Sequence, residues 1–155
     1  MALSGITPEY LAFLEDEEEV RLEPYLDPVG FPTIGIGHRV ESLDVPPLAD
    51  VAAVRALLAE DLIPRRANAL ALSPGLADEP EIRLSAILDF VFNAGATAYA
   101  TSTLRKRVNE KNWPAAAKEM RRWVYGTDQK TGLKVKLGGL VKRRNITANW
   151  LELGK

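Results

Sequence analysis

Apolar residues recur at helical spacing in three stretches of the chain. Thr7 is a hydroxyl N-cap followed by proline, which predicts a helix from residue 8 to about residue 18 or 19. Residues 48–62 carry an amphipathic pattern, which Pro64 should end, kink or restart. Residues 81–95 are apolar on nearly all sides at their centre, so they predict a buried central helix that ends at a glycine.

The remainder of the second half predicts shorter helices. We expect them at residues 102–110, 113–124 and 140–151. The stretch GTDQKTGLKVKLGG, residues 126–139, is polar and is expected to be a loop. No repeat, low-complexity segment or linker interrupts the pattern.

A segment of opposite character, RLEPYLDPVGFPTIGIG, occupies residues 21–37. Its centre, DPVG at residues 27–30, has turn chemistry, because Asp, Pro and Gly suit the first, second and fourth positions of a β-turn. The segment therefore predicts a β-hairpin. Pro24 and Pro32 imply that its strands have free edges and are not central in a sheet. The elements together predict a small helix–hairpin lobe joined to a larger helical lobe.

Composition limits the class of protein. A chain of 155 residues, 46% of them apolar, suits one domain with a sizeable core. It has no cysteine and a single histidine, His38, which excludes disulfides, thiolate metal sites and multi-histidine metal sites. The N-terminus has no basic region and no apolar run long enough for a secretion signal or a membrane span. We therefore expect that another protein must give this one access to any target outside the cytoplasm.

Charge divides the chain into two halves. Residues 1–61 contain three basic and thirteen acidic residues, a balance of −10, whereas residues 62–155 contain seventeen basic and eight acidic, a balance of +9. The asymmetry indicates two surfaces with different partners, unless it reflects only tolerance of charge by a soluble protein. The basic half suits an anionic polymer, such as cell-wall glycan with acidic stem peptides. Nucleotide or nucleic-acid binding is disfavoured, because GIGH at 35–38 matches no phosphate-binding loop and no DNA-docking motif is present.

Five acidic residues, Glu15 to Glu19, precede the predicted hairpin. Glycoside hydrolysis needs one carboxyl that stays protonated and one that stays ionised. Crowded carboxylates at a helix C-terminus favour the protonated form, since both their neighbours and the helix dipole are negative there. Asp27 opens a turn whose N–H groups can stabilise its anion. The plainer alternative is that Asp27 is only a turn residue and the glutamates only a solvated helix end.

The stretch EEVRLEPYLDPVGFPTIGIGH, residues 18–38, resembles the active-site segment of the phage-type lysozymes, the muramidases of tailed bacteriophages (glycoside hydrolase family 24). That family shows Glu, eight residues, Asp, five residues and Thr within a T-I-G-x-G-H run. Glu18, Asp27 and Thr33 fall on this spacing. The resemblance continues in order through most of the chain, in FVFNAG (90–95), STLRKRVN (102–109), W-x-x-A-A (113–117) and GLVKRR (139–144).

The resemblance implies an α+β, lysozyme-like fold of one domain, with an N-terminal lobe at about residues 1–61, a helical lobe at about 62–155 and an active-site cleft between them. It implies a monomeric endolysin that uses no metal or cofactor and cleaves the β-1,4 bond between N-acetylmuramic acid and N-acetylglucosamine in peptidoglycan. It would reach the wall from the host cytoplasm through a holin or another pore. Nucleic acid and stable membrane insertion are not expected.

The resemblance also implies roles for individual residues. Glu18 would be the general acid, Asp27 the base that orients a water, and Thr33 the group that holds this water. Phe92 and Thr103 match positions that line the saccharide cleft. Two further expectations concern charged residues. His38 supports the site residues or is structural, and is paired with a carboxylate; either Arg143 or Arg144 contacts Glu18.

Two positions depart from the family pattern. Glu19 stands where glycine usually follows the catalytic glutamate, and Pro32 stands where a bulky residue is common. Neither change removes a reacting group. Two other functions remain open on the sequence: a lytic transglycosylase, which needs only one acid, and a non-catalytic wall-binding or virion module.

Overall fold

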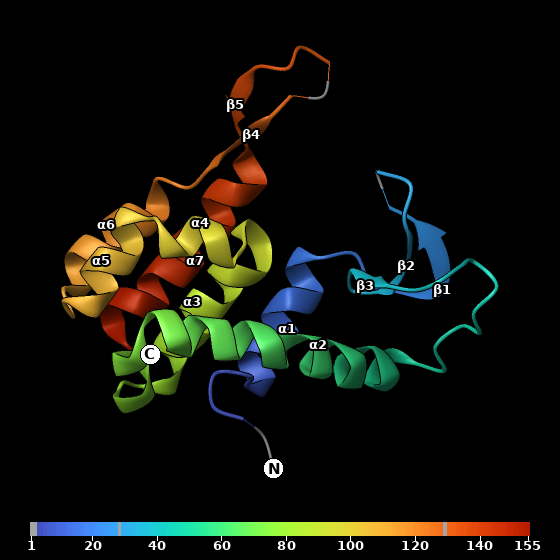
Figure 1. Ribbon diagram of the computed structural model, residues 1–155, viewed down its shortest axis with the longest axis horizontal. Coiled ribbons are helices and arrows are strands. Elements are labelled where there is room, and N and C mark those ends of the chain that lie inside the picture. The colour runs from blue at the N-terminus through green and yellow to red at the C-terminus, as the bar shows by residue number, and fades with distance from the viewer. Residues whose placement is uncertain (1–2, 28, 129) are drawn as a thin grey trace. The chain divides into compact units, whose positions relative to one another are not determined.

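The computed structural model describes residues 3–27, 29–128 and 130–155 (Figure 1). The chain forms two compact units, Met1–Pro64 and Arg65–Lys155. Helices predominate, and two small antiparallel sheets accompany them, one in each unit. The predicted α+β class is therefore confirmed.

The first unit begins with helix α1 (Pro8–Glu17). The Thr7 hydroxyl accepts a hydrogen bond from the Tyr10 N–H at 3.1 Å, as expected of an N-cap. The helix buries Tyr10, Phe13 and Leu14. It ends at Glu18, whose backbone is extended, so the predicted helix is correct to within one or two residues.

A three-stranded antiparallel sheet follows, with β1 (Arg21–Leu26), β2 (Pro32–Gly35) and β3 (His38–Arg39) in that order. The hairpin is confirmed, but the expectation of free edges is wrong for β2, which lies between its two neighbours. Pro32 is tolerated there because it is the first residue of the strand. Pro24 lies in edge strand β1, where the register shifts between Arg21 and Tyr25. The turn position expected for Pro28 lies outside the described residues.

Helix α2 (Val51–Leu72) continues through Pro64. Proline removes the hydrogen bond that the carbonyl four residues earlier, at Glu60, would accept. Both residues are exposed, so water can hydrate that carbonyl. Of the three outcomes left open for this proline, termination and restart are therefore excluded.

The second unit is helical around α3 (Glu81–Ala94), whose residues from Leu84 to Val91 are all buried. The predicted central helix is confirmed, and Gly95, with φ of 100°, ends it. The other elements are a 3-10 turn (Pro74–Asp78) and helices α4 (Ala96–Ala100), α5 (Thr103–Asn109), α6 (Trp113–Arg121) and α7 (Gly138–Leu153). Leu84, Phe90, Tyr99, Met120 and Leu151 belong to its core cluster.

The segment expected to be a polar loop instead forms a hairpin of β4 (Tyr125–Thr127) and β5 (Lys134–Lys136). It projects from the helices of its unit (Figure 1). The Asp128 carboxylate holds the turn by accepting from the N–H groups of Lys130 at 2.8 Å and Thr131 at 3.3 Å. Gly132 supplies a φ of 71°. The polar composition of the segment predicted a loop. Its strands can be polar because they pack against little of the hydrophobic core.

Candidate active site

Glu18 lies in the short connection between helix α1 and strand β1. It is the C-terminal cap of the helix, and its N–H donates to the carbonyl of Leu14 at 2.8 Å. The side chain is half-buried. Glu17 is the last residue of the helix, so Glu18 and Glu19 lie in the connection that leads to the sheet.

Two other members of the acidic run pair with arginines of the same unit. The Arg55 guanidinium donates to both carboxylate oxygens of Glu15, with Nη2 at 3.0 Å from Oε2, and this hydrogen bond lowers the pKa of Glu15. Arg21 lies 2.8 Å from Glu19, on an exposed surface. The run is thus not a uniform solvated face, because its members differ in partner and in burial.

Asp27 is held as an anion by the turn that it opens. Its Oδ1 accepts from the N–H of Phe31 at 2.8 Å and from the N–H of Val29 at 2.9 Å. These bonds, that of Phe31 foremost, hold the pKa of Asp27 below its usual range, although desolvation opposes them. The charge of Arg39 lowers this pKa further. The low pKa expected for Asp27 is confirmed.

The backbone of Phe31 also connects Asp27 to Thr33. Its carbonyl accepts from the Asp27 N–H and from the Thr33 hydroxyl, each at 2.9 Å. Thr33 is 2% exposed and lies on β2, opposite Tyr25 on one side and Arg39 on the other. Because its proton is donated to Phe31, the Thr33 oxygen retains lone pairs that can accept from a further donor.

The sequence did not mark Phe31, because its contribution is made entirely by main-chain atoms. Its side chain has a separate contact, since the Arg39 guanidinium lies 4.0 Å from the centre of its ring. The turn motif was the one signal that could have suggested a main-chain role here.

His38 is paired with a carboxylate, as expected. Its Nδ1 lies 2.8 Å from Oδ2 and 3.0 Å from Oδ1 of Asp61, and both side chains are partly buried. The pair ties strand β3 to helix α2 within the first unit. This position suits a structural role, since the side chain joins two elements that flank the hairpin.

The two residues expected to line a saccharide cleft lie in the second unit. Phe92 is a half-buried residue of α3, and the Arg65 guanidinium lies 5.1 Å from the centre of its ring. Thr103 is exposed at the first position of α5, directly after the N-cap Ser102. Their role in substrate binding stays a prediction, as do the catalytic roles of Glu18, Asp27 and Thr33.

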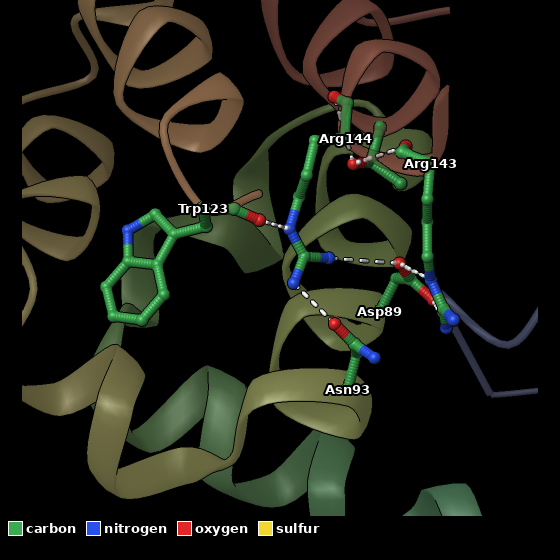
Figure 2. Close-up of polar contacts among 6 residues, drawn as sticks. Asp89, Asn93, Trp123, Arg143 and Arg144 are labelled. Atoms are coloured by element: carbon green, nitrogen blue, oxygen red, sulfur yellow. Dashed lines mark hydrogen bonds and ion pairs between the residues drawn. The ribbon is translucent and has the colours of Figure 1, made fainter. Parts of the chain in front are cut away.

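Arg143 and Arg144 are both buried in a polar network that the sequence did not reveal (Figure 2). Arg143 donates to both oxygens of Asp89 at 2.7 and 3.0 Å. Arg144 donates to the Trp123 carbonyl at 2.9 Å and to the Asn93 side chain. Burial lowers the pKa of Arg144 to about 10, so it stays charged at neutral pH. The signal available was Asp89, the one charged residue in the buried stretch from Leu84 to Val91 of this helix.

Two kinds of feature are absent from the described residues. Across residues 3–27, 29–128 and 130–155, no group of three or more His, Asp or Glu side chains is placed to hold a metal ion. In the same ranges, no helix combines the length and the apolar character needed to cross a bilayer.

Comparison with known proteins identifies related sequences. A family model for phage lysozyme matches residues 15–147. The chain is 36% identical over 139 residues to a SAR-endolysin of bacteriophage PS119, covering 89% of this chain and 78% of the relative. It is 30% identical over 139 residues to an endolysin of Acyrthosiphon pisum secondary endosymbiont phage 1, covering 90% and 92%.

Solved structures have the same fold. The muramidase domain of SpmX from Asticaccaulis excentricus superposes with a TM-score of 0.80 at 26% identity, covering 96% of this chain and 97% of that domain. A P22 lysozyme variant superposes with a TM-score of 0.77 at 28% identity, covering 99% of both chains. With the family match over most of its length, the chain belongs to the phage lysozyme family.

Proposed function

We propose that this protein is an endolysin that hydrolyses the β-1,4 bond between N-acetylmuramic acid and N-acetylglucosamine in bacterial peptidoglycan. Membership of a lysozyme family supports the substrate class. The observation that carries the mechanism is the hydrogen-bonded turn, in which the backbone of one residue, Phe31, binds both the Asp27 carboxylate and the Thr33 hydroxyl. An ionised carboxylate and a hydroxyl held together in this way can position a water.

Glu18 acts as the general acid. It protonates the leaving oxygen of the glycosidic bond, so the departing sugar leaves as an alcohol instead of an alkoxide.

Asp27 acts as the base. Its carboxylate accepts a proton from a water, which attacks the anomeric carbon on the face opposite the leaving group. The Thr33 oxygen accepts the second hydrogen of this water, since its own proton is donated to Phe31. A water between base and sugar gives inversion, with the carboxyls roughly 6.5–9.5 Å apart in the complex.

Phe92 and Thr103 contact the glycan. The Phe92 ring packs against the face of a sugar, and the Thr103 hydroxyl forms a hydrogen bond with the glycan. The His38–Asp61 pair supports the hairpin that carries Asp27 and Thr33. The protein acts as a monomer, and no metal or cofactor takes part in these steps.

Product analysis tests the reaction. The protein is incubated with purified peptidoglycan, and the new chain ends are identified by mass spectrometry. We expect reducing N-acetylmuramic acid ends. A 1,6-anhydro end would instead identify a lytic transglycosylase, and the absence of products would identify a wall-binding or virion module.

We further propose that the protein acts from the host cytoplasm and needs a pore, such as a holin, to reach the wall. Cells that express it alone should stay intact, and permeabilisation of the inner membrane should trigger lysis. Lysis without permeabilisation that depends on the secretion machinery would refute this route.

A further inference from the structure

We propose that the β4–β5 hairpin and the adjoining ends of α6 and α7 bind peptidoglycan, with Tyr125 against a sugar ring and Lys134 and Lys136 paired with stem-peptide carboxylates. The proposal rests on the proposed function, because it assumes that peptidoglycan is the polymer bound. It assigns a binding surface to a segment that has no part in the mechanism above.

Strand register places the relevant side chains on one face of the hairpin. Tyr125 is opposite Lys136, and Thr127 is opposite Lys134. Because side chains alternate along a strand, these four share a face, and Gly126 and Val135 occupy the other. The shared face combines an aromatic ring with two ammonium groups. Tyr125 is 54% exposed, so its ring is available to a ligand.

The charge of this region is strongly positive. Residues 121–142 contain six basic residues and one acidic residue, Asp128, whose carboxylate is occupied in the hairpin turn. Arg122 pairs with Glu119 at 3.3 Å. In contrast, neither Lys134 nor Lys136 has an ion-pair partner within the described part of the chain. Their charges are thus available to an external anion.

Two hollows lie beside this face. One, of about 550 Å³, is lined by Arg121, Arg122, Tyr125, Lys136 and Asn145, among others. The second, of about 240 Å³, is lined by Arg122, Trp123, Tyr125 and Lys134. Tyr125 and Arg122 line both, so the two hollows adjoin at these residues and can accept successive parts of one extended ligand.

The spacing of the two lysines suits a glycan that carries carboxylates. Two lysines at alternate positions of a strand lie about 6.6 Å apart, twice the rise per residue. This spacing allows each to meet a different carboxylate beside a ring stacked on Tyr125.

Binding to insoluble peptidoglycan tests the proposal. A double variant, Lys134→Gln with Lys136→Gln, is compared by co-sedimentation with the parent and with a matched control, Lys106→Gln with Lys118→Gln. The control removes the same charge from exposed positions on α5 and α6. All proteins carry Glu18→Gln so that the polymer stays intact. We expect the hairpin variant to bind about three- to tenfold more weakly, and the control to bind like the parent.

A second experiment measures binding after the stem peptides have been removed with an amidase. The parent should lose affinity by a similar factor, and the hairpin variant should no longer differ from it. Tyr125→Ala should weaken binding to both forms of the polymer, since the ring contacts sugar. Equal losses for the hairpin and control variants, or unchanged binding after amidase treatment, would overturn the proposal. So would a hairpin-dependent preference for DNA, teichoic acid or anionic vesicles over peptidoglycan.

The failure of this proposal can be told apart from the failure of the proposed function. Versions of the same proteins that retain Glu18 are assayed for cleavage of stem-free glycan chains. If the parent neither cleaves these chains nor binds the wall, the proposed function fails. If the parent cleaves them and the hairpin variants bind intact peptidoglycan as tightly as the parent, only the hairpin proposal fails.

Discussion

The two units of this protein differ in whether they enclose an ion pair. In the first unit, ion pairs lie at or near the surface: the side chains of Arg21 and Glu19 are 45% and 67% exposed. In the second, Arg143 and Asp89 are 6% and 0% exposed and form a two-pronged pair inside the core. One unit thus keeps its carboxylates accessible, and the other encloses one.

The difference separates the interactions that hold the candidate base from those that serve the fold. The candidate base Asp27 is positioned by main-chain N–H groups, which hold an anion in place without enclosing it. An enclosed pair such as Asp89–Arg143 loses its hydration and must be satisfied by fixed partners. Changes in the first unit should therefore alter activity with little effect on stability, and changes in the buried network should do the reverse.

The largest expected effect is on activity. Glu18→Gln keeps the size of the side chain but cannot donate a proton at neutral pH, so cleavage of purified peptidoglycan should fall by about 10²–10⁴-fold. Circular dichroism should show an unchanged fold. Glu17→Gln and Glu19→Gln are the matched controls and should stay within several-fold of the parent, since Glu17 is a helix residue and Glu19 forms only an exposed pair. If one of these controls were inactive while Glu18→Gln remained active, a different glutamate of the run would be the general acid.

Asp89→Asn tests the opposite half of the comparison. It keeps the shape of the side chain but removes the carboxylate that lies beside two buried guanidinium groups, so the free energy of unfolding should fall by about 3–5 kcal/mol. Urea denaturation followed by circular dichroism measures this. Glu110→Gln removes the carboxylate of an exposed pair with Arg107 and should cost less than about 1 kcal/mol. Similar losses in the two variants would mean that burial does not distinguish the pairs.

The pH dependence of activity should report Asp27. A base works when ionised, and the native turn lowers the pKa of this carboxyl below the ordinary value of 3.8. The acid limb of kcat/KM on soluble glycan should therefore lie below pH 3.8, provided that circular dichroism shows the protein still folded there. Because folding lowers this pKa, the turn's contribution to stability is present above pH 3.8 and is lost as the pH falls through the native pKa. An acid limb above pH 4 in the folded protein would argue against Asp27 as the base.

The smallest expected effect concerns salt. The unit at residues 65–155 carries seventeen basic and eight acidic residues, and it should supply most of the attraction to anionic wall polymer. Exposed charges are screened over roughly 8 Å at physiological ionic strength. Binding to wall fragments should weaken steadily as salt rises, while the unfolding midpoint in urea changes little. If the affinity for wall fragments did not change between low and high salt, the charge asymmetry would have a cause other than wall binding.

Local signals in the sequence determined the elements that depend on neighbouring residues. Thr7-Pro8 marked the start of α1, the turn after Asp27 marked the first hairpin and the low pKa of its carboxyl, and the apolar run before Gly95 marked the central helix. The spacing of Glu18, Asp27 and Thr33 marked the family. Each signal acts over a few residues, so it is legible without knowledge of the fold.

Tertiary structure alone decided which distant groups meet. That His38 needs a carboxylate was predictable, but that it takes Asp61 was not. No sequence pattern required Arg143 to pair with Asp89. None required the polar segment after Tyr125 to form a second hairpin. These outcomes depend on which faces pack together, because a charged side chain pairs with whatever oxygen the packing brings within about 3 Å. The spacing of residues along the chain does not determine which groups come that close.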